Sequence, residues 1–312
     1  MRTILIYFLL ALTAIASPLY DAIDSNDSRL VTTLLQNGAD PYERRNTKIA
    51  KGVVVDNAFC YAAEISDEKT INAFLPYINN MNQPCTGNTP LIHAAAKGNL
   101  PAMRILLKNG ADINKTALYS YHDTPLMTAT STNQIKAMEF LIAHGANVNY
   151  VGSHDFSALT YSIGNSNPTT AGLLIDSGFR LDSQAGFEAM KMAVLTLKYD
   201  MVKFLLDHKY NPNFKDQNGN TVLHLIARGD IESNIRNLEA YKKRTDLPKA
   251  LHDTDAIQKN IDTLKSRMHY YPTIIRELLL HGANRNTKNM KGKTPVDLAK
   301  ENKIRTVLEV LQ

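Results

Sequence analysis

GNTPLIHAAAKGNLPAMRILLKNGADINK, residues 87–115, carries the signals that decide how this chain folds. Thr89 followed by Pro90 predicts a helix start. A threonine hydroxyl caps a first turn, and proline fits the first helical position, where no N–H is needed. Gly98 and Gly110 suit the left-handed conformation that ends a helix. The stretch therefore predicts two short helices in succession, followed by a loop.

Both predicted helices have an apolar face. In the first, Leu91, Ala94 and Ala95 share one side, and the small alanines allow a neighbouring helix to approach closely. The second helix has large apolar side chains at helical spacing, namely Met103, Leu106 and Leu107. One such pair cannot bury its apolar surface alone, so further copies are expected.

The same pattern recurs along the chain. Its closing glycines are Gly38, Gly110, Gly145, Gly178 and Gly282, with Lys209 in the equivalent place of one unit. Successive steps from Gly110 to Lys209 are 35, 33 and 31 residues. A fixed period near 33 residues indicates a stacked repeat array.

The Thr-Pro-Leu start, the Ala-Ala pair and the Leu-Leu-x-x-Gly-Ala-Asp end resemble the ankyrin repeat, and this resemblance covers nearly all of residues 17–312. It implies an all-α fold, an ankyrin-type repeat solenoid of about eight helix-turn-helix units. Units that depart from the pattern, such as the one with Lys209-Tyr210 in place of Gly-Ala, put the regularity of stacking in doubt there. The last unit, about residues 290–312, is expected to cap the array with a polar face.

The segment of about residues 228–272 interrupts one unit between its two helices. Apolar residues recur there at steps of three and four in two runs, which predicts a helical-hairpin insertion. Two interpretations stay open. The two apolar stripes cover each other, or the hairpin contacts a partner.

Residues 1–16 are typical of an export signal. Arg2 supplies a positive start, an apolar run follows from residue 4 to residue 16, and Ala14-Ile15-Ala16 gives a small-x-small cleavage site before Ser17. The alternative interpretation is a buried N-terminal helix. Export predicts a periplasmic or secreted protein.

Composition excludes several classes of protein. The chain is 44% apolar and 21% charged, with a formal net charge of +5, which suits a folded protein. Acidic and basic residues are interleaved without a basic stripe, so no nucleic-acid partner is expected. After the signal, no segment approaches about 20 consecutive apolar residues, so no membrane association is expected after cleavage.

The two cysteines, Cys60 and Cys85, fall in regions that an ankyrin-like stack brings near each other. An exported protein meets an oxidising compartment, so a disulfide between them is one prediction. Two separate buried thiols are the alternative. The nine histidines show no metal-ligand spacing, and His224 is expected to make hydrogen bonds within and between units. No metal and no cofactor are predicted.

Two connecting loops carry the candidate partner-binding residues. They are longer than a minimal connection and rich in aromatic side chains, which are enriched at interface hot spots. The candidates are Tyr119, Tyr121, His122, Tyr150, His154 and Phe156. Alternatively, their rings pack loop against loop.

No nucleophile elbow, phosphate loop or dinucleotide fingerprint is present in the sequence, so no enzyme is predicted. The resemblance implies a non-enzymatic module, expected to be monomeric, that binds a protein. With an export signal it resembles bacterial periplasmic ankyrin proteins, which implies a periplasmic binder such as an immunity protein neutralising a toxin, or a stress-defence partner. The alternative is a secreted effector that binds host proteins.

Overall fold

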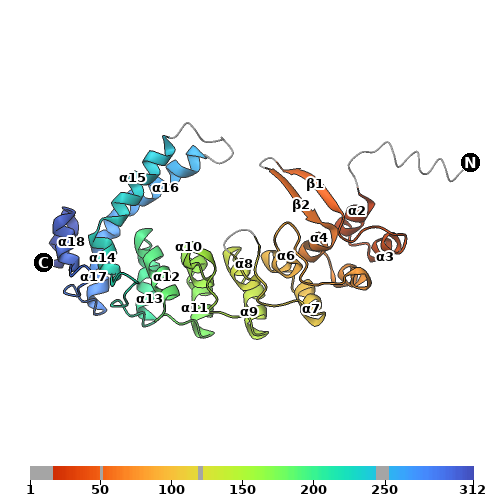
Figure 1. Cartoon of the computed structure of the whole chain (residues 1–312), viewed down its shortest axis with the longest axis horizontal. Helices are drawn as coiled ribbons and strands as arrows, with labels where there is room; N and C mark the ends of the chain where they lie inside the picture. The colour runs from red at the N-terminus through yellow and green to blue at the C-terminus, as the bar shows by residue number, and fades with distance from the viewer. Residues whose placement is uncertain (1–16, 50–51, 119–121, 244–252) are drawn as a thin grey trace, which may run out of the picture. The chain divides into compact units, whose positions relative to one another are not determined.

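The computed structural model of the 312-residue chain describes residues 17–49, 52–118, 122–243 and 253–312 (Figure 1). The predicted export signal, residues 1–16, lies outside the described residues. The chain divides into two compact units, residues 1–147 and 148–312, which are described separately. Among the described residues, no helix combines the length and the apolar character needed to cross a membrane.

The helix pair at residues 87–115 forms as its sequence predicts. The Thr89 hydroxyl accepts a hydrogen bond from the Ile92 N–H (3.3 Å) at the start of α6 (Pro90–Lys97). Gly98 then adopts a left-handed conformation with φ of 70°, which ends the helix and turns the chain into α7 (Leu100–Lys108).

The first unit contains four such pairs. Their first helices, α2, α4, α6 and α8, contact one another in order, and their second helices, α3, α5, α7 and α9, form the layer behind them. The remaining bounds are α2 (Pro18–Asp24), α3 (Ser28–Gln36), α4 (Ala58–Ile65), α5 (Glu68–Phe74), the 3-10 turn η1 (Leu75–Tyr77), α8 (Pro125–Ser131) and α9 (Ile135–Ala143).

The first unit also contains two strands that the sequence analysis does not predict. β1 (Arg44–Ile49) pairs antiparallel with β2 (Gly52–Asn57), in a register that runs from Arg44 opposite Asn57 to Ile49 opposite Gly52. The hairpin fills the long connection between α3 and α4, and β2 runs directly into α4. It is an addition to the helical repeats rather than a change of fold class.

The second unit continues the two-layer arrangement. The first helices α10, α12, α14 and α18 contact one another in order, while α13, α17 and α19 do so in the second layer. The bounds are α10 (Ala158–Gly164), α11 (Pro168–Asp176), α12 (Gln184–Leu195), α13 (Tyr199–Asp207), α14 (Val222–Ala227), α17 (Tyr271–Leu280), α18 (Pro295–Glu301) and α19 (Arg305–Leu311), with 3-10 turns η2 (Ser153–Asp155) and η4 (Met268–Tyr270). The described residues thus contain eight helix pairs, and the predicted repeat solenoid is confirmed.

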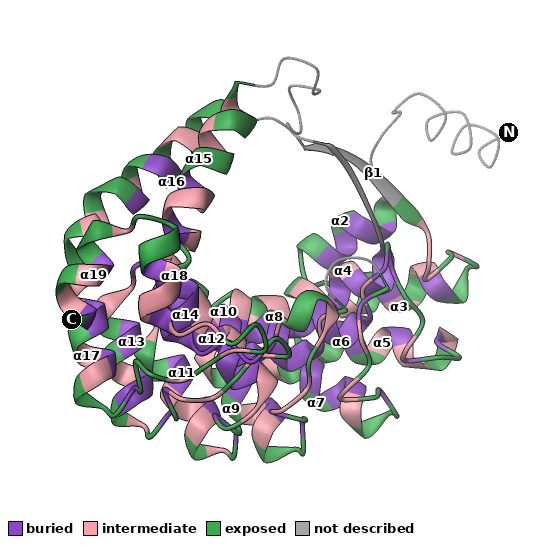
Figure 2. Cartoon of the chain, turned by 60° about the vertical axis from the view of Figure 1, so that its left-hand side comes forward, coloured by how far each residue is buried: buried purple, intermediate pink, exposed green. Residues whose placement is uncertain are grey.

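The predicted helical-hairpin insertion is also confirmed. α15 (Asp230–Lys242) and α16 (Thr254–Arg267) come between α14 and α17 in the chain and lie side by side, as Figures 1 and 2 show. The two helices are joined by polar contacts, such as the Lys265–Glu239 ion pair (2.6 Å). Their apolar stripes contain the buried side chains Ile231, Ile235, Ile261 and Leu264.

Burial follows the contact surfaces between neighbouring helices (Figure 2). The first-helix layer contains many alanines that are almost fully buried: Ala58, Ala62, Ala63, Ala94, Ala95, Ala129, Ala158, Ala189 and Ala193. The last pair exposes the polar residues that an array end needs, among them Lys300, Glu301, Lys303, Arg305, Glu309 and Gln312.

Asparagines in several connecting loops bond one helix pair to the next. The Asn213 amide donates to the Gly282 carbonyl (2.8 Å) and accepts from the Asn284 N–H (2.7 Å). Asn149 makes the same two bonds with Gly178 and Arg180, at 2.9 and 2.8 Å. A side-chain amide has both the donor and the acceptor that this bridge requires.

His224 links two helix pairs in the same way that the sequence analysis predicts. Its Nδ1 accepts from the Thr221 N–H (3.1 Å), and its Nε2 lies 3.1 Å from the Lys293 carbonyl oxygen in the loop before α18. An accepting Nδ1 leaves the proton on Nε2, so the imidazole is neutral. Burial lowers the pKa of His224 from its usual value.

We expect Asn213→Ala to lower the free energy of unfolding by about 1 kcal/mol, because two hydrogen bonds between helix pairs are lost and water replaces them only in part. Chemical denaturation followed by circular dichroism measures this. Asn286 occupies the equivalent place in the next loop, and within the described part of the chain its amide makes no bond to another pair. Asn286→Ala should therefore have a smaller effect, and equal losses would contradict the bridging role.

We expect the burial of His224 to make the free energy of unfolding depend on pH. The folded-state pKa is lowered, so below the ordinary histidine pKa of about 6.5 the unfolded chain binds more protons than the folded one. The contribution of neutral, buried His224 to the free energy of unfolding is complete above that pH and is lost as the pH falls below it. The free energy of unfolding, compared at pH 7.5 and 5.5, should fall less in His224→Gln than in the wild type. An identical fall in both proteins would refute this.

Candidate functional site

Four of the six predicted partner-binding residues lie among the described residues, one in the first unit and three in the second. Tyr119 and Tyr121 lie outside the described residues. His122, at the end of the same connection in the first unit, is exposed and has a left-handed backbone with φ of 57°. The other three belong to the second unit and to one connection, residues 150–156, which we call the finger loop.

The finger loop is a short, tightly bonded turn. Val151 pairs with Ser157 in an isolated antiparallel bridge, and the Gly152 N–H donates to the Phe156 carbonyl (2.8 Å). At its tip, His154 and Asp155 both have left-handed backbones, with φ of 57° and 59°. This conformation costs about 1 kcal/mol or more for each residue other than glycine, so surrounding bonds must hold it.

A hollow of about 300 Å³ lies between the finger loop and α12. We call it the loop hollow. Its walls combine residues from the loop with residues from the first-helix layer: His154, Asp155, Phe156, Thr160, Glu188, Lys191, Met192, Leu195 and Thr196. The structure therefore brings His154 and Phe156 to one site, whereas half-buried Tyr150 does not line it.

The loop hollow has apolar and charged parts. Phe156, Met192 and Leu195 are half-buried and supply apolar surface. Beside them, Lys191 Nζ donates to Glu188 Oε2 (2.6 Å). Few polar groups within an apolar lining are typical of a site that receives an anchoring side chain.

Phe156 contacts a neighbouring helix and also lines the loop hollow. Its ring packs against that of Tyr161 on α10, with centroids 5.6 Å apart, which is a contact between loop and helix and differs from the loop-against-loop packing considered from the sequence. The same side chain remains half-buried and lines the loop hollow. His154, at the tip, is exposed.

A second hollow of about 410 Å³ lies where the insertion meets the helix pairs. Tyr199 and Tyr270 stack there with ring centroids 5.8 Å apart. Lys198 donates to the Ile163 carbonyl (2.9 Å), and burial, followed by the nearby Arg267 charge, lowers the pKa of Lys198. Because Arg267 at the end of α16 donates to the Thr196 carbonyl (3.4 Å), we interpret this hollow as the anchor of the insertion.

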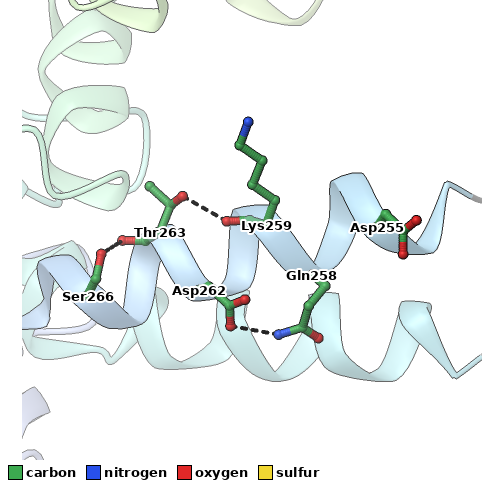
Figure 3. Close-up of a pocket in the computed structure, with 6 residues that line it drawn as sticks. All are labelled: Asp255, Gln258, Lys259, Asp262, Thr263 and Ser266. Atoms are coloured by element: carbon green, nitrogen blue, oxygen red, sulfur yellow. Dashed lines mark hydrogen bonds between the residues drawn. The ribbon is translucent and has the colours of Figure 1, made fainter.

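The outer face of α16 is polar, as Figure 3 shows. Its side chains bond mostly along the helix itself. Gln258 Nε2 donates to Asp262 Oδ1 (2.6 Å), and the Thr263 hydroxyl donates to the Lys259 carbonyl (2.7 Å). A solvated face of this kind gives no anchor to a partner, so the loop hollow is the stronger candidate.

The structure joins Cys60 to Cys85 in a disulfide, with the Cα atoms 6.3 Å apart. Both residues are buried. His93 lies beside them and faces Glu64, with Nδ1 3.5 Å from the carboxylate. The hydrogen bond to His93 lowers the pKa of Glu64, and Lys97 acts in the same direction. Packing of α4 on α6 brings His93 and the cysteines together from different elements, an arrangement that was not predicted from the sequence.

Comparison with known proteins identifies the repeats. A family model of ankyrin repeats in three copies matches residues 19–117 and 117–185. The ankyrin repeat domain of human ASB11 is 17% identical, with a TM-score of 0.54 over 81% of this chain and 98% of that one. The ankyrin repeat domain of Bcl-3, a member of the IkappaB protein family, is 18% identical, with a TM-score of 0.55 over 95% and 98%.

A search of curated proteins finds no match. The structural similarities, at these identities, bear on the fold alone, whereas the family match spans more than half of the chain. Ankyrin repeats are protein–protein interaction modules. From its helix pairs, its period and this match, the chain belongs to the ankyrin repeat family.

Proposed function

We propose that this chain is a non-enzymatic binder that receives a side chain of a protein partner in the loop hollow. The observation that carries the proposal is the combination of Phe156, Met192 and Leu195 in one hollow of about 300 Å³. Apolar surface left half-exposed beside an ion pair is suited to an apolar or aromatic anchor with a polar neighbour.

The finger loop supports this proposal through its rigidity. Left-handed backbones at His154 and Asp155 are held by the bridge between Val151 and Ser157. A loop fixed before binding loses less conformational entropy on association, which favours affinity. Strained backbone of this kind is also found often at ligand-binding sites.

We further propose that the protein acts outside the cytoplasm, since residues 1–16 have the features of an export signal. In the periplasm, the function we favour is protection of the producing cell, as an immunity protein that neutralises a toxin or as a stress-defence partner. A secreted effector that binds host proteins is the alternative. The protective role and the effector role differ in where the mature protein accumulates.

The loop hollow is tested by placing a photo-crosslinking amino acid, p-benzoylphenylalanine, at Met192 in the protein expressed in its own organism. Irradiation should give one discrete crosslinked species containing a second protein, which mass spectrometry identifies. The same amino acid at Arg305, whose side chain is 92% exposed on α19, serves as the control. Equal crosslinking at both positions would indicate random collision and would refute a site at the hollow.

Export is tested by fractionating the same cells and sequencing the N-terminus of the mature protein. We expect Ser17 as the first residue, because a small-x-small site precedes it. Recovery from the periplasmic fraction supports the protective role, and recovery from the medium supports the effector. A chain that retains Met1 in the cytoplasm would overturn both.

A further inference from the structure

Three side chains that bind metals lie together in the first unit. Cys60 is on α4, Cys85 is in the turn before α6, and His93 is on α6. Their sulfur and nitrogen ligand atoms all lie within 4.8 Å of one another. The residues are only 0%, 2% and 8% exposed. We call this group the cysteine–histidine cluster.

The surrounding backbone fixes the two sulfur-bearing residues. The Cys60 N–H donates to the side chain of Asn57, which caps α4 (2.9 Å). Cys85 and Asn88 exchange both backbone hydrogen bonds, at 2.7 and 2.9 Å, across a two-residue turn. A preformed backbone lets the cluster hold a ligand without reordering the chain.

The histidine has the carboxylate partner that metal-bound histidines usually have. Glu64 lies one helical turn after Cys60 on α4, and its Oε2 is 3.5 Å from His93 Nδ1. Lys97 holds the other carboxylate oxygen at 2.9 Å. A carboxylate on one ring nitrogen fixes the tautomer and orients the other nitrogen, here Nε2, for a metal.

We propose that Cys60 and Cys85, when reduced, bind Zn²⁺ together with His93. Among the biological divalent ions, zinc is the one typically bound by thiolate and imidazole ligands together. In tetrahedral zinc sites the bonds are about 2.3 Å to sulfur and about 2.0–2.1 Å to nitrogen, which places ligand atoms within 4 Å of one another. The cluster reaches this spacing by small side-chain movements.

Zinc binding requires the disulfide to be opened first. A dithiol reductant transfers two electrons and two protons to the pair, which breaks the S–S bond, gives two thiols, and turns the reductant into its own disulfide. Zn²⁺ then displaces the two thiol protons, and neutral His93 donates its Nε2 lone pair without losing a proton. The cluster supplies three ligands, so water or another small ligand takes the fourth position.

The test compares the oxidised and the reduced protein with Zn²⁺ as the probe, after removal of the soluble reductant without air. Native mass spectrometry should show one bound zinc on the reduced form that the oxidised form lacks, and zinc should raise the melting temperature of the reduced form alone. Replacing Zn²⁺ with Co²⁺ should give thiolate-to-cobalt charge-transfer absorption. No zinc on the reduced protein, or equal binding to both forms, would overturn the site.

Variants assign the ligands. His93→Gln should weaken zinc binding about tenfold or more, and Glu64→Gln, at a positioning residue, should weaken it while the Co²⁺ absorption stays. His144→Gln, which removes an exposed histidine at the end of α9, is the control and should change nothing. If reduction unfolds the protein, zinc must restore the helical circular dichroism of the wild type but not of Cys60→Ser. Failure of that restoration would equally refute the proposal.

Discussion

No helix pair in this chain hides its apolar face by itself, and the rest of the structure follows from that constraint. Alanines such as Ala62, Ala94 and Ala189 are fully buried because the next first helix lies directly against them. The loop asparagines and His224 add hydrogen bonds across the same junctions. Stability therefore resides in contacts between neighbouring pairs, and residues away from those junctions are free to serve binding.

The insertion shows how far this freedom extends. α15 and α16 separate the two helices of one pair, α14 and α17, by more than forty residues, yet α17 still packs beside α13 and α19. Tyr271 of α17 helps to keep the pair together. Its buried hydroxyl donates to the Ile226 carbonyl of α14 (2.9 Å), which connects the two helices across the insertion. The array tolerates a long excursion because only the junction has to be restored.

Local signals account for what the sequence could predict. Thr89, Pro90 and Gly98 act within one helix, so the helix pairs, their number and the insertion follow from reading along the chain. The β1–β2 hairpin lies in a connection between helix pairs, for which the repeat pattern predicts no secondary structure. The loop hollow and the cysteine–histidine cluster depend on contacts between successive pairs. His93 lies 33 residues after Cys60, which is one repeat period, and the packing of α4 on α6 brings the two side chains together.

The crosslink that the cysteine–histidine cluster forms at the junction between α4 and α6 depends on the compartment in which the protein resides. The disulfide closes a loop of 25 residues, which in the chain-entropy model stabilises the folded state by about 3 kcal/mol. Such a bond persists only in oxidising surroundings. In reducing surroundings the two sulfurs are no longer bonded to each other. They then crosslink this junction only if a metal replaces the covalent bond, and His93 and Glu64 are already in place for that metal. In this proposal, the environment selects which of two crosslinks joins these helix pairs.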